Sequence, residues 1–355
     1  MKTSNILAIC LALFFSVSVL AQQNLQRENF VSDASFIVGT YQPAENDHSP
    51  ASIVKAAKTF QESLSEQQRA KLEHALDSRE RRKWTNLPAR RDAGGITMNQ
   101  LDETQLKKLC DLMAALFSEQ GYQKMRNIML ADDTLLQGGR ARPGFGTETF
   151  AVVIFGQPSE TEPWAFQLDG HHVGVNVAIT GADLTMAPSF IGTQPESFQL
   201  ASETVRPLKN GVDGAYELAM SLNDDQRRKA VVRPTRGRIV TGPGADDHVP
   251  DTQGISVKEF SDEQKAKLMM LVECWVGDMP AAHATKKMQQ VKESIDEMYF
   301  SWNGETDKDS DVSWRIQGPN LIIEYACQDL GGNPLQHLHT MYRDPTNDYG
   351  KQLDP

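Results

Sequence analysis

The sequence predicts an α+β protein with one largely antiparallel sheet, because two blocks of helix-type sequence alternate with two blocks of strand-type sequence. Apolar residues recur at helical spacing over residues ~50–136 and ~261–298, whereas β-branched runs and alternating patterns fill residues ~148–217 and ~312–343. Strand blocks separated by helices are typical of α+β folds. We therefore expect both strand blocks to join one sheet, on which the helical segments pack.

The first segment of the chain has the pattern of a secretory signal peptide. Lys2 precedes an uncharged run from Ile6 to Leu20, and the segment closes with Val19-Leu20-Ala21. The run is shorter than the roughly 20 apolar residues that a membrane-spanning helix needs. We expect residues 1–21 to be a signal peptide cleaved after Ala21, a secreted or periplasmic location, and no membrane contact once the signal is removed.

Helix starts are marked by residues that can satisfy the free amides of a first helical turn. Ser49 and Pro50 suit the first such start, and an extended lead-in is expected before it, over residues 22–48. Four later starts have the pattern of a capping box, at residues 65–68, 102–105, 223–226 and 261–264. No fixed period links the four, so a solenoid is not indicated.

Strands are expected in two groups. The first covers residues 150–155 and 164–180, with further strands and turns over residues 184–217. The second is a hairpin of residues 314–316 and 321–327, joined by Gly318-Pro319-Asn320, with a third strand over residues 337–343.

The charge balance limits the classes of partner. The chain has 355 residues, with 36 basic and 47 acidic side chains and a formal net charge of −11. An acidic surface argues against nucleic acid or an anionic membrane as the main partner. We therefore expect a small-molecule or carbohydrate ligand and no nucleic acid; the sequence does not indicate an oligomeric state.

Histidines carry the strongest chemical signal, because four of the eight form two tight pairs in the expected strand regions. Alternate residues of a strand share a face, so His337 and His339 can close on one metal ion. His171 and His172 are adjacent and cannot both project the same way from a regular strand. Either one of them faces the site, or Gly170 marks a bend that turns both inward.

Other polar residues of the same strands could complete this site. Glu324 lies in the strand next in sequence and could supply a carboxylate. Two or three imidazoles with a carboxylate suit Zn²⁺, Cu²⁺ or Fe²⁺, and we expect one such divalent ion and no other cofactor. Asp169 and Gln167 could hold an imidazole tautomer. The alternative is that both pairs are structural, with each ring hydrogen-bonded in a polar core or solvated at a sheet edge.

Seven motifs together resemble those of a known family. They are Trp84-Thr85-Asn86-Leu87-Pro88, Phe155-Gly156-Gln157-Pro158, Trp164-Ala165-Phe166-Gln167-Leu168-Asp169-Gly170-His171-His172, Trp302-Asn303-Gly304, His337-Leu338-His339-Thr340, Tyr342-Arg343-Asp344-Pro345 and Asn347-Asp348-Tyr349-Gly350. In this order they resemble an uncharacterised, mostly secreted bacterial family, the domain of unknown function DUF3500. The resemblance implies a single α+β domain over residues 49–355 and an extracytoplasmic setting, and it implies no reaction.

Two of these motifs leave their roles open. Arg343 and Asp344 could line the site, or they could form a buried ion-pair network that ties the C-terminus to the sheet. Trp164, like the other four tryptophans, could line a ligand groove or stack on a sugar, and Trp164 adjoins a proline, where a rigid wall is an equal alternative.

Two functions follow from these features. The first is a secreted metal site that supports hydrolytic or oxidative chemistry on a small extracellular substrate, with catalytic residues unidentified. The second is a non-catalytic envelope protein that binds a ligand, such as a carbohydrate. The sequence does not decide whether the protein is an enzyme.

Overall fold

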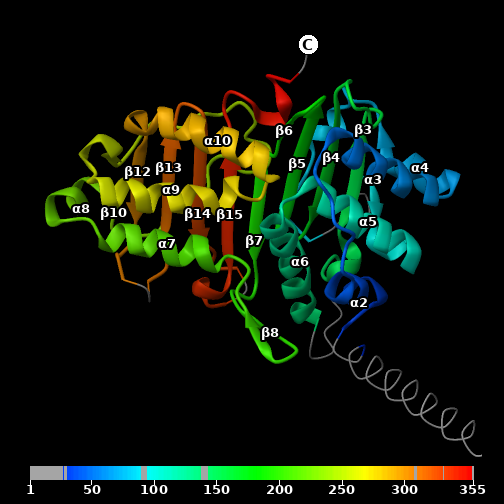
Figure 1. The fold of residues 1–355 in the computed structure, drawn as a ribbon. Helices are drawn as coiled ribbons and strands as arrows, with labels where there is room; N and C mark the ends of the chain where they lie inside the picture. The colour runs from blue at the N-terminus through cyan, green and yellow to red at the C-terminus, as the bar shows by residue number, and fades with distance from the viewer. Residues whose placement is uncertain are drawn as a thin grey trace, which may run out of the picture.

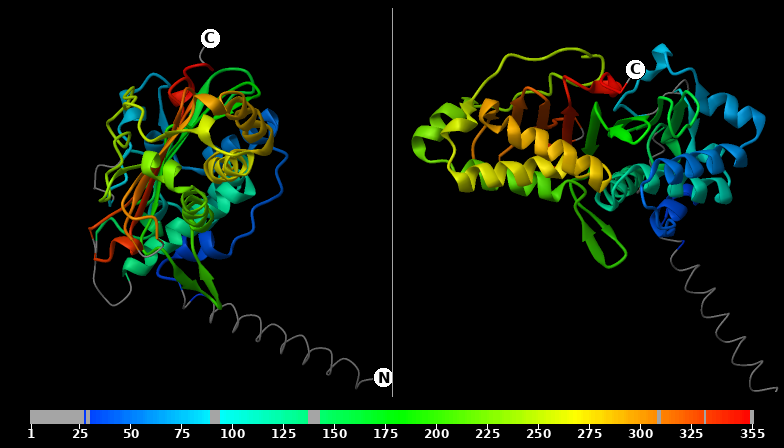
Figure 2. Two further views of the ribbon diagram at one scale, coloured as in Figure 1. Left: turned by 90° about the vertical axis from the view of Figure 1, so that its left-hand side faces the viewer. Right: turned by 45° about the horizontal axis from the view of Figure 1, so that its top comes forward.

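The computed structural model describes residue 27 and residues 30–88, 94–136, 143–307, 310–330 and 332–353. The expected signal peptide, residues 1–21, lies outside the described residues. Among the helices of the described part, none is both long and apolar enough to cross a membrane. The molecule has a long sheet with helices over one face, while long loop segments cover the other face (Figures 1 and 2).

Helices occur in two groups along the chain. The first group is α2 (Asp33–Thr40), α3 (Pro50–Ser63), α4 (Glu66–Leu72), α5 (Glu103–Leu116) and α6 (Glu119–Asp133). The second group is α7 (Lys209–Met220), α8 (Asp224–Ala230), α9 (Asp262–Val276) and α10 (Ala281–Glu293).

Strands also occur in two groups. The first is β1 (Glu73–His74), β2 (Ile96–Thr97), β3 (Ala151–Phe155), β4 (Trp164–Gly170), β5 (Val173–Thr180), β6 (Asp183–Thr185) and β7 (Ser189–Thr193), followed by the separate hairpin of β8 (Phe198–Leu200) and β9 (Glu203–Val205). The second is β10 (Val231–Arg233), β11 (Ile255–Ser256), β12 (Tyr299–Asn303), β13 (Ser313–Gly318), β14 (Leu321–Cys327) and β15 (Leu338–Arg343).

Both strand groups join one sheet, as the sequence predicted. Its order is β1-β3-β4-β5-β7-β15-β14-β13-β12-β10, with β2, β6 and β11 paired beside this path. Along this order, every two neighbouring strands from β3 to β12 are antiparallel. Parallel pairing occurs only at the two ends, between β1 and β3 and between β10 and β12. The α+β fold class is therefore confirmed.

The two groups of elements repeat one order. In residues 50–193, α3 and α4 lead to β1, β2 precedes α5 and α6, and β3, β4, β5 and β7 follow. In residues 209–343, α7 and α8 lead to β10, β11 precedes α9 and α10, and β12 to β15 follow. The sheet order also reads the same outward from its central antiparallel pair, β7 with β15. The two halves are thus related by a pseudo-twofold axis at that pair.

All four predicted capping boxes are present, and they show the repeat in the sequence itself. They begin at Ser65, Asp102, Asn223 and Ser261. The first and third begin 158 residues apart, and the second and fourth begin 159 residues apart. The four boxes are therefore two copies of one pair. A solenoid would need a much shorter repeat, so its exclusion from the sequence stands, but the long repeat was not predicted. In each copy the two box glutamines hydrogen-bond to each other, Gln68 to Gln105 and Gln226 to Gln264.

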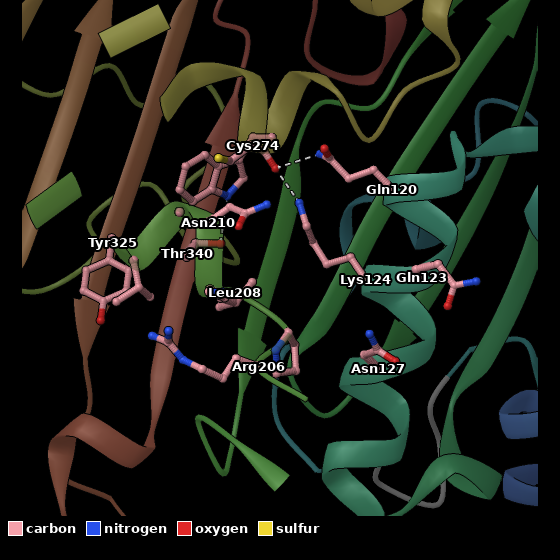
Figure 3. A pocket seen from close by; sticks show the side chains of 15 residues that line it. Gln120, Gln123, Lys124, Asn127, Arg206, Leu208, Asn210, Cys274, Tyr325 and Thr340 are labelled. Carbon is pink, nitrogen blue, oxygen red and sulfur yellow. Dashed lines mark hydrogen bonds between the residues drawn. The ribbon is translucent and has the colours of Figure 1, made fainter. Parts of the chain in front are cut away.

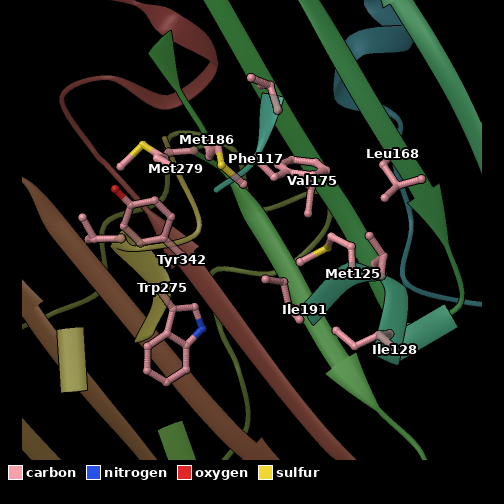
Figure 4. Packing of buried hydrophobic residues seen from close by; sticks show 14 of the residues in the cluster. Phe117, Met125, Ile128, Leu168, Val175, Met186, Ile191, Trp275, Met279 and Tyr342 are labelled. Carbon is pink, nitrogen blue, oxygen red and sulfur yellow. The ribbon is translucent and has the colours of Figure 1, made fainter. Parts of the chain in front are cut away.

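The core lies between the sheet and the helices. Phe117, Met125 and Ile128 pack onto residues of β4, β5 and β7, and Trp275 and Met279 pack onto the second half in the same layer (Figure 4). One continuous cluster of buried residues includes side chains from both halves. Burial of apolar area at roughly 25 cal/mol per Å² is the main term that stabilises such a layer.

Two predicted segments differ in the structure. The expected extended lead-in contains helix α2, because Ser32 forms a capping box with Ser35, and Ile37 and Val38 are buried where α2 contacts α5 and α6. Residues 209–217, expected to be strands and turns, belong to helix α7, whose buried side chains lie where it packs against α9. The sheet also contains β12 and four short strands, β1, β2, β10 and β11, outside the predicted strand ranges.

Candidate metal centre

The first histidine pair forms the loop of a hairpin. Gly170 at the end of β4 pairs with Val173 at the start of β5, so His171 and His172 are the two loop residues. The chain thus turns after Gly170, and the pair does not lie in a regular strand. His172 has a φ of 70°, in the left-handed region where glycine is usual at this position. A side chain in this conformation costs roughly 1–2 kcal/mol, which is typical of positions that a site requires.

The second pair lies at the start of β15. His339 is opposite Ala326 of β14 and Gly192 of β7, and His337 directly precedes the strand. Thr340, the next residue, accepts a hydrogen bond from the Trp275 indole of α9 and so faces the helices. Because side chains alternate along a strand, His337 and His339 share the other face, as the sequence predicted.

Three imidazoles converge where the hairpin meets β15. The Nε2 atom of His337 lies 2.8 Å from Nε2 of His172 and 3.0 Å from Nε2 of His339. One ligand atom from each of the three rings can be chosen so that all lie within 4.8 Å of one another. Bonds of about 2.0–2.1 Å to a tetrahedral ion separate two nitrogens by roughly 3.3 Å. Small shifts would therefore bring the three nitrogens to bonding positions around one ion.

Gly192 of β7 makes room for this convergence. A Cβ atom at Gly192 would lie 2.9 Å from Cδ2 of His172, 3.0 Å from Cδ2 of His339 and 2.7 Å from the Leu338 carbonyl oxygen. Its backbone N–H also donates to the His172 carbonyl at 2.7 Å. A hydrogen is therefore the only side chain at this position that leaves both rings undisturbed.

The proton on His337 is placed by the backbone. Its Nδ1 atom lies 2.5 Å from the carbonyl oxygen of Leu330, so Nδ1 carries the hydrogen and donates it. Nε2 of the neutral ring is then a bare lone pair aimed at the other two rings. A carbonyl that fixes the tautomer in this way is the usual support of a metal-binding histidine.

Burial keeps these rings neutral. It lowers the pKa of His172 well below the ordinary value, and the neighbouring histidines lower it further. Burial also lowers the pKa of His337, and it lowers that of His339 to about 3, again with a contribution from His337. Neutral imidazole is the form that binds metal ions, so no proton has to leave these rings near neutral pH.

His171 supports this group and is not part of it. Its Nδ1 atom lies 2.5 Å from a carboxylate oxygen of Asp132 at the end of α6, and the other Asp132 oxygen accepts from the Gly146 amide at 2.6 Å. The His171 ring lies against His172 in a tilted contact, with centroids 3.7 Å apart and planes 35° apart. Ring lone pairs lie in the ring planes, and two planes only 35° apart at this separation do not converge on one ion at bonding distance. Asp132, His171 and His172 do form a second group with ligand atoms within 4.8 Å, but this ring contact favours a supporting role for His171.

Glu324 lies outside both of these groups. It shares a face with His339, but its carboxylate accepts from the amides of Val240 and Thr241 at 3.0 and 2.9 Å, and from the Thr241 hydroxyl at 2.6 Å. A loop that is distant in sequence thus occupies the carboxylate that the sequence had assigned to the metal. Asp132 is the acid that lies beside the histidines, and no sequence motif links it to them.

The other predicted site residues of β4 bond elsewhere. Asp169 accepts from the Thr85 amide at 3.2 Å, and burial raises the pKa of its carboxyl to about 7. Gln167 donates to the Arg81 carbonyl at 3.0 Å and to the Asn176 side chain at 2.6 Å. These bonds hold the loop that covers this face of the sheet, and neither residue takes the expected part of orienting an imidazole.

Arg343 and Asp344 lie at the far end of β15 from His337. Arg343 pairs with Asp348 at 2.9 Å and Asp246 at 3.1 Å, and Asp344 pairs with Lys287 at 2.5 Å. Of the five members of this network, all except Asp246 are buried. Of the two alternatives from the sequence, the geometry is that of an ion-pair network that ties the C-terminal segment to the sheet.

The tryptophans do not form an exposed stacking surface. Trp164 lies at the opposite end of β4 from the histidines and is 1% exposed. The other four, Trp84, Trp275, Trp302 and Trp314, are between 1% and 5% exposed. The five indoles are therefore mostly packed into the interior, and a carbohydrate ligand stays a prediction from the sequence.

Comparison with known proteins gives one match. A family model described as a protein of unknown function, DUF3500, matches residues 46–351. No curated protein and no solved structure matches the chain. The matched range includes all the histidines of the candidate centre and both halves of the sheet.

Proposed function

Because the chain belongs to the DUF3500 family, whose description assigns no activity, we propose from the geometry of its own residues that it is a metalloprotein. In this proposal His172, His337 and His339 bind one divalent transition metal ion, with Zn²⁺, Cu²⁺ and Fe²⁺ as the candidates that suit imidazole. His171 and Asp132 hold the His172 ring in place. The ion serves hydrolytic or oxidative chemistry on a small substrate.

The bare Nε2 atom of His337 is the observation that carries the proposal. Without an ion, this one lone pair would be the acceptor for both His172 and His339, at 2.8 and 3.0 Å. One nitrogen lone pair accepts one strong hydrogen bond, so one close contact between buried rings would be poorly compensated. With an ion, all three lone pairs are used.

Three protein ligands favour a reactive ion over a structural one. Structural zinc sites are closed by four protein ligands, whereas catalytic sites have three and keep one position for water or substrate. His339 is half-buried while His172 and His337 are buried, so the group reaches solvent on the His339 side. An ion there would lower the pKa of bound water toward about 7.

Metal analysis of untagged protein tests the proposal. We expect close to one equivalent of Zn, Cu or Fe by mass spectrometry, and loss of the ion in the double variant His337→Ala, His339→Ala. His248→Ala is the matched control, because His248 is exposed and is in neither group. Metal-free protein that also fails to bind any of the three ions on titration, or undiminished binding in the double variant, would overturn it.

Cobalt substitution separates a reactive ion from a structural one. Co²⁺ bound at three imidazoles with an open position should change its visible absorption spectrum when azide is added. A spectrum that does not respond to azide would show a closed site, and the protein would then be a binding or structural metalloprotein.

The expected export of the protein is part of the proposal. Cleavage after Ala21 would give a mature chain that begins at Gln22. N-terminal sequencing of the protein from periplasmic and extracellular fractions checks this. Recovery of the intact chain, starting at Met1, from the cytoplasmic fraction would contradict it.

A further inference from the structure

A cavity on the other face of the sheet has no part in the metal proposal. It has a volume of about 280 Å³ and lies between α6, the start of α7, the end of α9 and strands β14 and β15 (Figure 3). Thr340 lines it, whereas its neighbour His339 points to the opposite face. The cavity is therefore separated from the histidines by the sheet. Its volume equals about nine water molecules at roughly 30 Å³ each, which suits a small organic ligand.

The floor of the cavity is apolar and firmly held. Trp275 lies against Gly211, where a Cβ atom would come within 2.8 Å of the indole ring. Its Nε1 atom donates to Thr340 at 3.1 Å. Tyr325 is stacked on Trp314, with centroids 5.5 Å apart and planes 8° apart. Two aromatic side chains with fixed positions thus form a preformed apolar surface.

The charged lining is entirely basic. Lys124, Arg206 and Lys209 line the cavity, and no Asp or Glu is among its lining residues. Lys124 is neutralised by Asp278 at 2.7 Å, and Arg206 pairs with Asp213 at 3.0 Å. Within the described residues, the Lys209 ammonium group forms no hydrogen bond or ion pair, and the residue is exposed. One free positive charge therefore remains at the cavity, in a chain with an excess of acidic residues.

The neutral polar lining offers donors. The amide oxygens of Gln123 and Asn127 accept from the Arg126 guanidinium at 3.4 and 3.1 Å. Their NH₂ groups are left free to donate. The side-chain amide of Asn210, beside Lys209, has no partner among the described residues. Free donors and a free ammonium group complement a ligand whose polar atoms are negatively charged acceptors.

We propose that this cavity binds a small organic carboxylate with an apolar body. The carboxylate pairs with Lys209 and accepts from the amides of Asn210 and Asn127, and the apolar body lies on Trp275 and Tyr325. The few polar groups around an apolar floor are the usual composition of a small-molecule site.

Benzoate is the probe that tests this assignment, with benzamide as its neutral counterpart. Saturation-transfer NMR and calorimetry on the full protein should show that benzoate binds and that benzamide binds roughly two- to fivefold more weakly, as expected when one partly exposed ion pair is lost. Lys209→Met should weaken the binding of benzoate by a similar factor and leave the binding of benzamide unchanged. Lys58→Met, at an exposed lysine of α3, is the matched charge control.

A second variant fills the cavity without changing charge. Asn210→Trp should abolish benzoate binding while its thermal unfolding stays close to that of the wild type, because Asn210 is exposed. The His337→Ala, His339→Ala variant should bind benzoate as the wild type does. Absence of benzoate binding, equal binding of benzamide, or undiminished binding in either the Lys209 or the Asn210 variant would overturn the assignment.

Discussion

The two halves of the sheet have the same framework and different chemistry. The β4–β5 loop of the first half is His171-His172, whereas the equivalent β13–β14 loop of the second half is Pro319-Asn320. The second half supplies His337 and His339 at the start of β15 instead. The three converging imidazoles therefore come from both halves, and they meet beside the central β7–β15 pair. The repeated elements position the site, and residues that are not repeated form it.

The largest effect on metal affinity and stability should come from a change at the junction between the halves, where β7 pairs with β15. Gly192→Ala places a methyl group against His172, His339 and the Leu338 carbonyl. We expect metal affinity to fall roughly 10- to 100-fold, as for other supporting positions, and the free energy of unfolding to fall by about 1–3 kcal/mol through overpacking.

Metal titration and chemical denaturation measure both effects. Gly94→Ala is the matched control, because nothing lies within 4 Å of a Cβ atom there. Equal metal affinity in the two alanine variants would show that the junction does not position the rings.

The next prediction tests whether equivalent hydrogen bonds in the two halves contribute equally to the free energy of unfolding. Gln105 bonds to Gln68, to the Ser63 carbonyl and to the Asp102 amide, and Gln264 makes the equivalent bonds in the second half. Removing either set costs roughly 0.5–1.5 kcal/mol per bond. We expect Gln105→Ala and Gln264→Ala each to lower the free energy of unfolding by about 2–3 kcal/mol.

Chemical denaturation compares the two glutamines directly, with exposed Gln289→Ala as the control. A difference of more than about 1.5 kcal/mol between Gln105→Ala and Gln264→Ala, larger than one bond contributes, would show that the two frameworks differ in energy as well as in sequence.

The next prediction is a pH effect on stability that comes from the end of α6. Asp133, near the end of α6, accepts from Thr147, and burial raises the pKa of its carboxyl to about 7 from 3.8. The folded state therefore holds this proton more tightly than the unfolded chain does. The resulting stability is complete below pH 3.8 and is lost as the pH rises through 7. We expect this carboxyl to contribute a loss on the order of 2 kcal/mol between pH 5 and pH 8.

Asp133→Asn should reduce this loss, which urea denaturation at both pH values measures. Asp169 has a similarly raised pKa of about 7, so the variant removes part of the slope and the rest remains. The buried histidines His172, His337 and His339 act in the opposite sense over this range, because their pKa values are lowered. The test is therefore the stability difference between the wild type and Asp133→Asn, and a difference that stays the same at pH 5 and pH 8 would contradict the prediction.

The smallest effect concerns the left-handed residue of the histidine loop. His172→Gly and His172→Ala both remove the imidazole, but only glycine adopts a φ of 70° without strain. We expect the glycine variant to be more stable than the alanine variant by about 1 kcal/mol. Thermal unfolding of the two metal-free variants checks the difference, and a more stable alanine variant would show that the loop takes another conformation.

Local signals in the sequence predicted local structure well. Each capping box was identified correctly because its hydrogen bonds join residues three apart, and the β13–β14 hairpin was identified because its turn residues separate two apolar runs. Helix α7 was missed because Gly211 weakens the helical pattern; that glycine is explained by the Trp275 ring packed against it. The repeat was not predicted because its copies lie 158 and 159 residues apart and resemble each other only in short segments at and beside the caps.

The site was predictable only where it depends on a local pattern in the sequence. Alternation along one strand places His337 and His339 on one face, whatever the rest of the fold. Glu324 shares that face as well, but the approach of Thr241 from a distant loop decides what its carboxylate binds. Asp132 lies 39 residues from its partner His171, and only the packing of α6 on the sheet brings the two together.

The short strands at the two ends of the sheet affect how copies of this protein meet. The outermost strands, β1 and β10, have two and three residues, and the register of β10 shifts between Val231 and Arg233. A long, flat, unpaired edge offers a row of free amides and carbonyls on which another chain can add a strand. Here each end presents only a few such groups, so a sheet of 13 strands is protected against edge-to-edge aggregation by its own shortest members.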